Sequence, residues 1–235
     1  MNEDWKKILD CYPEEKKQWD KTYPWIYFVA RPVSFPITWL LHKMGIIANQ
    51  VTFFTALLGI VSLPLFISGQ TEMMIFGACC IVLYNLLDCV DGNLARTWPT
   101  DKIPKGKFWD QLVGNFYILL YFAIGIGVNE FLWLVVGAGI TIGKYLIEGI
   151  RYVFWNVLGK NWEISKKLSN YEPHTGKWYY RVYYNFTDPQ AHIFLLPAVI
   201  ALNWLKPFLA ITSIITVLQL IFVTVFYIWR SKKLK

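Results

Sequence analysis

The sequence predicts an all-α integral membrane protein, with six transmembrane helices preceded by an amphipathic helix at the membrane surface. The first observation is composition: 55% of the 235 residues are hydrophobic and only 17% are charged, whereas an ordinary soluble domain has roughly 25% charged residues. The second is the presence of six long apolar stretches, and runs of about 18 or more apolar residues are typical of transmembrane helices. The third is the distribution of lysine and arginine between the connections.

The N-terminal segment differs from the rest of the chain in composition. Residues 1–30 are rich in charged residues, tryptophan and tyrosine, which is typical of a surface or interfacial segment. Residues 31–46 (RPVSFPITWLLHKMGI) are amphipathic with basic ends, and we expect a helix that lies along the lipid headgroups. We therefore predict that 1–46 forms a cytoplasmic segment ahead of the membrane domain.

The membrane domain is predicted to cover residues 47–230, followed by a basic cytoplasmic tail at 231–235. Its six expected spans have approximate bounds 50–68, 72–96, 107–127, 131–155, 191–205 and 207–229.

The charges in the connections predict the orientation. The three short connections, 69–72, 128–130 and 203–207, contain one lysine between them, Lys206. By the positive-inside rule, both termini and the two longer loops are cytoplasmic, in an inner or cytoplasmic membrane. The net charge of +7 then reflects this bias and contact with anionic lipids, rather than binding to nucleic acid. The side opposite the three short connections, which is the predicted cytoplasmic side, holds Lys102, Lys105, Lys107, Lys160, Lys166, Lys167, Lys177, Arg181, Arg230, Lys232, Lys233 and Lys235.

Two aspartates lie at the cytoplasmic end of the second span, which reads YNLLDCVDGNLART. A charged residue within a transmembrane helix costs about 2.5–3.5 kcal/mol unless it is paired or bound to a cation. Asp88 and Asp91 are three residues apart, so they share a helix face, and Gly92 leaves room for a ligand or another helix. Asp110 opens the third span in the same membrane layer. Three carboxylates suit one or two Mg²⁺ or Mn²⁺ ions; the alternative is structural pairing with lysine or arginine.

These residues resemble the signature of the CDP-alcohol phosphotransferases, because the chain reads Asp88-x-x-Asp91-Gly92-x-x-Ala95-Arg96, then nine residues, then Gly106-x-x-x-Asp110. The resemblance implies a six-helix membrane enzyme, commonly a homodimer. Such enzymes transfer a phosphoalcohol group, often phosphatidyl, from a CDP-linked donor to an acceptor hydroxyl and release CMP, in phospholipid biosynthesis.

The resemblance also implies roles for individual residues. Asp88 and Asp110 would each contact both metals of a two-metal site, and Asp91 would complete the first metal. The implied contacts to the CDP-linked donor are Gly92, Ala95 and Arg96.

The segment 45–52 resembles the entrance to the family's first helix, although Ala48 stands where proline is usual. Asn49 and Thr52 are therefore candidate nucleotide contacts. The alternative for both is ordinary helix capping.

One position departs from the family pattern. Gly114 stands four residues after Asp110, where the family has an aspartate that acts as general base and helps to hold the second metal. A general base typically contributes 10²–10⁴-fold, so its loss needs an explanation. An acceptor that attacks through an ionised phosphate, phosphonate or carboxylate oxygen needs no base. Alternatively, another residue replaces it, or the protein binds nucleotide without catalysis. The candidate replacements are Asn115, Glu148, Asp188 and His192.

The fourth span contains the charged stretch GKYLIEGIR. The spacing of Lys144, Glu148 and Arg151 puts all three on one helix face, which should face the bundle interior or water. Gly149-Ile-Arg151 resembles a Gly-Leu-Arg element of phosphatidylglycerophosphate synthases, in which the arginine holds an acceptor phosphate. We therefore predict that Lys144 and Arg151 bind an anionic acceptor. The alternatives are that Glu148 neutralises both cations, or that Arg151 extends to the cytoplasmic surface.

A transporter that uses these carboxylates for coupled ions is a different class of interpretation. Such proteins often have internal repeats and broken helices at matching positions. The sequence shows neither feature, so the phosphotransferase interpretation is favoured.

Overall fold

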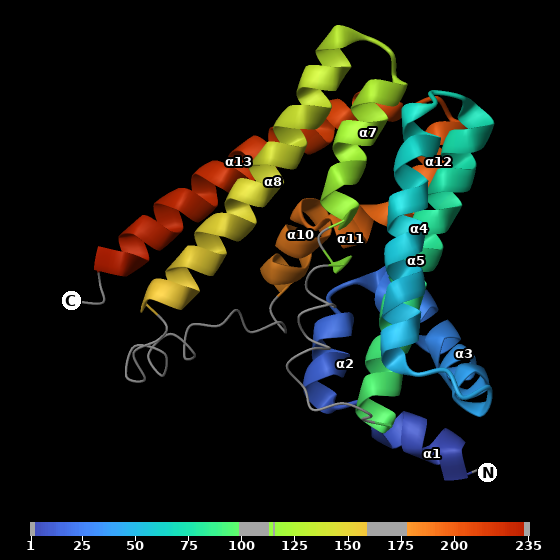
Figure 1. Ribbon diagram of the computed structural model, residues 1–235. Helices are drawn as coiled ribbons and strands as arrows, with labels where there is room; N and C mark the ends of the chain where they lie inside the picture. The colour runs from blue at the N-terminus through green and yellow to red at the C-terminus, as the bar shows by residue number, and fades with distance from the viewer. Residues whose placement is uncertain (1–2, 99–112, 115, 159–177, 233–235) are drawn as a thin grey trace.

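The computed structural model describes residues 3–98, 113–114, 116–158 and 178–232, and all regular structure in these ranges is helical (Figure 1). The predicted all-α class is therefore confirmed for the described part of the chain.

The N-terminal segment forms a group of short helices around one end of the long helix α5 (Figure 1). The predicted amphipathic helix is present as α3, but Arg31 at its start is buried and points into the protein rather than toward lipid headgroups. The elements are α1 (Glu3–Asp10), α2 (Glu14–Asp20), the π-helical turn η1 (Ile26–Ala30) and α3 (Arg31–Lys43).

Among the described residues, four helices are long and apolar enough to cross a membrane, and they coincide with the first, second, fourth and sixth predicted spans. They form two pairs, α4 with α5 and α8 with α13 (Figure 1). The bounds are Ala48–Ile67 for α4, Thr71–Thr97 for α5, Phe131–Leu158 for α8 and Leu205–Lys232 for α13.

The third and fifth predicted spans are shorter apolar helices, covering Phe116–Gly127 and Pro189–Ala201. The third was predicted as one helix from residue 107. Its described part instead has Gly114 in a turn, then a 3₁₀ helix, then an α-helix. The elements are η2 (Phe116–Leu119) and α7 (Leu120–Gly127).

The fifth segment is divided into α11 (Pro189–His192), the 3₁₀ helix η3 (Ile193–Leu195) and α12 (Leu196–Ala201). Pro197 has no N–H to donate to the carbonyl of Ile193 four residues earlier, which explains the break. The helix ends before the predicted residue 205, because Asn203 adopts a left-handed conformation with φ 57°. The count of six spans therefore stays a prediction, because in the described part of the chain four helices are long enough to cross a membrane.

The three short connections lie together at the end of the molecule opposite α1–α3 (Figure 1). Two glycines allow this approach: a Cβ on Gly69 would lie 2.5 Å from the Gly127 carbonyl oxygen. The third connection joins them through Lys206, whose Nζ is 2.6 Å from Glu130 Oε1. These are the three connections that the distribution of lysine and arginine predicts on one side of the membrane.

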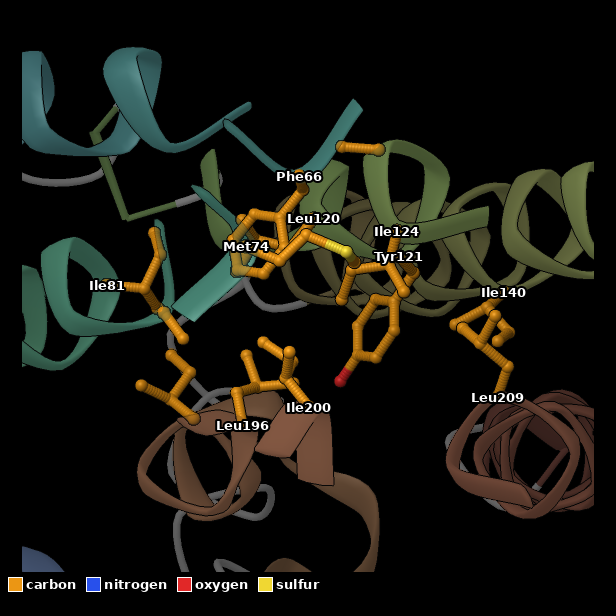
Figure 2. Close-up of a cluster of buried hydrophobic side chains, with 13 residues drawn as sticks. Phe66, Met74, Ile81, Leu120, Tyr121, Ile124, Ile140, Leu196, Ile200 and Leu209 are labelled. Carbon is orange, nitrogen blue, oxygen red and sulfur yellow. The ribbon is translucent and has the colours of Figure 1, made fainter. Parts of the chain in front are cut away.

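The hydrophobic core lies where the short helices α7 and α12 are enclosed by the long ones (Figure 2). In lipid, such contacts stabilise by van der Waals packing rather than by removal of surface from water. The core therefore fixes the position of the short helices between the two pairs. Its labelled members are Phe66, Met74, Ile81, Leu120, Tyr121, Ile124, Ile140, Leu196, Ile200 and Leu209.

Candidate functional site

The first polar region lies where α4 begins and α5 ends. Asp88 and Asp91 are one turn apart near the end of α5, and the Asp91 side chain is only 6% exposed. Thr52, in the first turns of α4, donates a hydrogen bond from Oγ1 to Asp91 Oδ2 at 2.7 Å. The antiparallel packing of α4 and α5 thus brings two predicted site residues, Thr52 and Asp91, into direct contact.

The two described carboxylates fit a divalent metal by their chemistry. Asp88 is half-buried beside the buried Asp91, and carboxylate oxygens are the usual protein ligands of Mg²⁺. Asp110 lies outside the described residues. Within the described ranges, no group of three or more histidine, cysteine, aspartate or glutamate side chains is gathered as a metal site.

The start of α4 bears on the capping alternative for Asn49 and Thr52. The N-cap is Ile47, and its backbone N–H donates to Gln50 Oε1 at 3.0 Å. Neither predicted donor contact is therefore the N-cap residue. Asn49 is half-buried one residue inside the helix.

Arg96 folds back over Gly92. A Cβ at Gly92 would lie 3.2 Å from Arg96 Nη1, so the space that glycine leaves is occupied by the guanidinium. Arg96 Nη2 donates to Asn93 Oδ1 at 2.9 Å, and among the described residues no carboxylate forms an ion pair with Arg96. Arg96 thus has a neutral hydrogen-bond partner in Asn93, and Ala95 is exposed beside it.

The second polar region is a cleft of about 60 Å³ that holds the charged face of α8. Lys144, Glu148 and Arg151 all line it, as their spacing predicted. The other walls come from η2, α11, α13 and α10 (Trp178–Thr187). They contribute Tyr117, Ile118, Tyr184, Thr187, Asp188 and Gln219.

Lys144 is 5% exposed and bonds to two neutral oxygens. Its Nζ donates to the Thr187 carbonyl and to Gln219 Oε1, the latter at 2.9 Å. Glu148 Oε1 is 2.6 Å from Arg151 Nη1. Among the described residues, Glu148 therefore pairs with Arg151 and not with Lys144. A buried ammonium with only neutral partners is costly, and an anion in the cleft would offset that cost.

Asp188, one of the candidate replacement bases, lines the cleft but is already engaged. Oδ1 accepts from the backbone N–H of Gln190, which caps α11, and Oδ2 accepts from Tyr23 at 2.6 Å. Burial, and then the Asp188 charge, raise the pKa of Tyr23, so the phenol stays protonated and keeps donating. His192 does not line this cleft and bonds through Nε2 to the Asn185 carbonyl.

Gly114 is linked to both polar regions through its neighbours in the sequence. It is half-buried in a turn directly after Val113, whose carbonyl accepts a hydrogen bond from Tyr84 at 2.6 Å. Tyr84 is one helical turn before Asp88 on α5. Three residues beyond Gly114, Tyr117 lines the cleft. The position that lacks the family's aspartate is therefore connected to the first region through Val113 and to the second through Tyr117.

Two residues of the cleft, Gln219 and Thr187, were not predicted from sequence as site residues, and neither was Tyr183, which contacts the cleft residues Arg151 and Gln219. Gln219 is a buried polar residue in an apolar span, and that alone is a signal for function. Thr187 contributes through its backbone carbonyl, and Tyr183 through long contacts to Arg151 and Gln219. The sequence carries no signal for either.

The family profile of the CDP-alcohol phosphatidyltransferases matches residues 45–170, just over half of the chain. The chain belongs to this family of transferases, which act in phospholipid synthesis and generally use a divalent metal. The match includes the aspartate motif, Lys144 and Arg151, and leaves α1–α3 and α10–α13 outside it. A search of curated proteins found no match.

Proposed function

We propose that the chain transfers a phosphoalcohol group, most simply phosphatidyl, from a CDP-linked donor to an anionic acceptor and releases CMP. The observation that carries this proposal is Lys144, a buried cation without a carboxylate hydrogen-bond partner among the described residues. Lys144 lies in a cleft that is also lined by Tyr117, three residues after Gly114 in the sequence. This arrangement supports an anion-binding site close to the position where the base is missing.

The donor is held at the ends of α4 and α5. Asp88, Asp91 and the expected third carboxylate, Asp110, would hold one or two Mg²⁺ or Mn²⁺ ions. When bound, the metal stabilises the charge that develops on the departing CMP. Arg96 binds diphosphate oxygens, for which guanidinium geometry is well suited. The remaining proposed donor contacts are Asn49, Thr52, Gly92 and Ala95.

An ionised acceptor oxygen removes the need for a base. In the transfer step, this oxygen forms a bond to the phosphorus that carries the alcohol group. The bond from that phosphorus to the CMP oxygen breaks, and CMP leaves with the electron pair. No proton moves in this step when the attacking oxygen is a phosphate, phosphonate or carboxylate. Lys144 and Arg151 hold the acceptor.

The protein is proposed to work in this way with six spans, in an inner or cytoplasmic membrane. Its termini and site would be cytoplasmic, and it would be a homodimer. The grouping of the three short connections opposite α1–α3 supports the six-span layout, whereas the cytoplasmic side rests on the positive-inside rule and the homodimer on the family resemblance.

The test is CMP release by the purified chain with Mg²⁺ and CDP-diacylglycerol. Three acceptors are compared: a neutral polyol, a phosphorylated polyol, and a phosphonate without a hydroxyl. Gly114→Asp is measured beside it, with Gly114→Asn as a control of equal size that has no carboxylate. We expect the native chain to use the anionic acceptors, and only Gly114→Asp to gain turnover with the neutral polyol.

Other outcomes identify the alternatives. Turnover of the native chain with the neutral polyol alone would contradict the anionic acceptor. Nucleotide binding without CMP release from any pair would indicate a protein that binds donor without catalysis. Ion flux in proteoliposomes without CMP release would indicate a transporter.

A further inference from the structure

Asn93 uses the full hydrogen-bonding capacity of its side chain. Oδ1 accepts from Arg31 Nη1 and from Arg96 Nη2, each at 2.9 Å. Nδ2 donates to Ser34 Oγ at 2.9 Å and to Thr38 Oγ1 at 3.3 Å. An amide has two acceptor sites and two donors, so none is left over in a side chain only 4% exposed.

Three of these four bonds come from one face of α3. Arg31, Ser34 and Thr38 are spaced by three and four residues, which places them on the same side of a helix. All three are buried against α5. The face belongs to the N-terminal segment, outside residues 45–170 of the family match.

The surroundings permit only one orientation of the Asn93 amide. The Ser34 hydroxyl donates to the Arg31 carbonyl and the Thr38 hydroxyl to the Ser34 carbonyl, both at 2.7 Å. Each hydroxyl has therefore committed its hydrogen and offers only lone pairs to Nδ2. A guanidinium only donates, so a flipped amide would lose all four bonds. The oxygen of Asn93 is thus kept pointing at Arg96.

The two guanidiniums that share this oxygen differ in charge compensation. Arg31 Nε is 2.7 Å from Asp20 Oδ2, and this carboxylate is fully buried. Arg96 forms no such ion pair within the described part of the chain, and its Nε is buried without a hydrogen-bond partner there. Of the two cations, Arg31 is paired with a carboxylate, whereas Arg96 is the one that the family resemblance predicts to contact the donor.

We propose that Asn93, held by Arg31, Ser34 and Thr38, is a positioning residue that fixes the Arg96 guanidinium for the donor diphosphate. The inference rests on the proposed function, because it takes Arg96 as a donor contact. It assigns the N-terminal helix α3 a part in donor binding, through an amide that itself touches no substrate.

The test compares Asn93→Ala and the double variant Ser34→Ala/Thr38→Ala with the native full-length chain. The matched control is Ser62→Ala, which removes another fully buried serine hydroxyl, bonded to the Gly59 carbonyl within α4. Thr38→Ser restores the hydroxyl at that position. The KM for CDP-diacylglycerol, the KM for the acceptor and the Tm are measured for each.

We expect Asn93→Ala to raise the donor KM about 10-fold or more, because a hydrogen bond to a charged group contributes about 1.5–3 kcal/mol. The double variant should raise the donor KM about threefold, since it frees the amide to rotate without removing it. The acceptor KM should stay within about twofold in both, and Thr38→Ser and Ser62→Ala should match the native chain.

Equal changes in the donor and acceptor KM, or a lowered Tm with the donor KM unchanged, would overturn the inference and leave Asn93 a structural tie. If Asn93→Ala does not fold, the double variant decides by the same criteria. A native chain that neither binds CDP-diacylglycerol nor releases CMP would refute the proposed function together with this inference. Native turnover with an unchanged donor KM in the variants would refute this inference alone.

Discussion

The two polar regions of the molecule are built in opposite ways. The donor region, at the ends of α4 and α5, takes most of its residues from one stretch, 88–96, and its side chains are tied together by short bonds. The acceptor cleft collects residues from five elements between Tyr117 and Gln219, and it encloses open space.

The charges differ as well. The donor region combines Asp88 and Asp91 with Arg96, as needed for a metal and a diphosphate together. In the acceptor cleft, Glu148 pairs with Arg151 and leaves Lys144 with neutral partners. A region with carboxylates can recruit cations, whereas a cleft whose buried ammonium bonds only to neutral oxygens has a donor to offer an anion. Under the proposed function, this difference assigns the metal-dependent donor to the first region and the anionic acceptor to the second.

The largest effect is expected from Asp91→Asn. The change keeps the size of the side chain and an oxygen for Thr52, but removes the negative charge. Metal stabilisation of transition-state charge is worth several kcal/mol, so CMP release should fall at least about 100-fold. The assay is CMP release at saturating donor and acceptor across a range of Mg²⁺ concentrations.

Glu130→Gln is the control for this change, because Glu130 is an exposed carboxylate at the opposite end of the molecule. It should keep native turnover. If Asp91→Asn also kept it, the acidic pair would have a structural role and the donor region would be misassigned.

Much of the fold could be predicted because long apolar runs are a local property. The four long helices lie within a few residues of their expected bounds. The third and fifth segments were less predictable: the fifth is broken by Pro197, which has no N–H to donate, and the third contains a turn at Gly114. A window of hydrophobicity does not contain that information.

The site shows the same division. The aspartate motif is local, and its spacing alone places Asp88 and Asp91 on one face. Arg31, in contrast, was expected at the membrane surface, because its partners, Asp20 and Asn93, lie 11 and 62 residues away. Long-range pairing of buried polar groups depends on the packing of α3 against α5, which no short pattern encodes.

The second-largest effect is expected from Lys144→Met, which removes the ammonium and keeps an apolar chain of similar length. A hydrogen bond to a charged group is worth about 1.5–3 kcal/mol, so the KM for an anionic acceptor should rise about 10- to 100-fold. The donor KM should not change. Lys206→Met is the control, since Lys206 is an exposed lysine paired with Glu130 away from the cleft. A rise in the donor KM instead would place Lys144 in the donor region.

The smallest effect, and the sharpest comparison, comes from two tyrosines of the N-terminal segment. Tyr23 donates to Asp188 at 2.6 Å beside the acceptor cleft, and Tyr12 donates to Asp20 at 2.7 Å beside Arg31. Burial and the neighbouring carboxylate raise the pKa of both phenols. Both stay protonated below their raised pKa, so neither should add a pH-dependent step to turnover between about pH 6 and 9.

Tyr23→Phe leaves Asp188 with one donor fewer, so more negative charge faces the cleft. We expect the acceptor KM to rise about three- to tenfold, which is the range for one hydrogen bond, with the donor KM unchanged. Tyr12→Phe removes one hydrogen bond to the Asp20 carboxylate that pairs with Arg31. It should raise the donor KM alone, by a similar or smaller factor. If each variant moved both constants equally, the N-terminal segment would act as one structural unit. If Tyr23→Phe changes only the acceptor KM and Tyr12→Phe changes only the donor KM, the N-terminal segment supports the two regions through separate contacts.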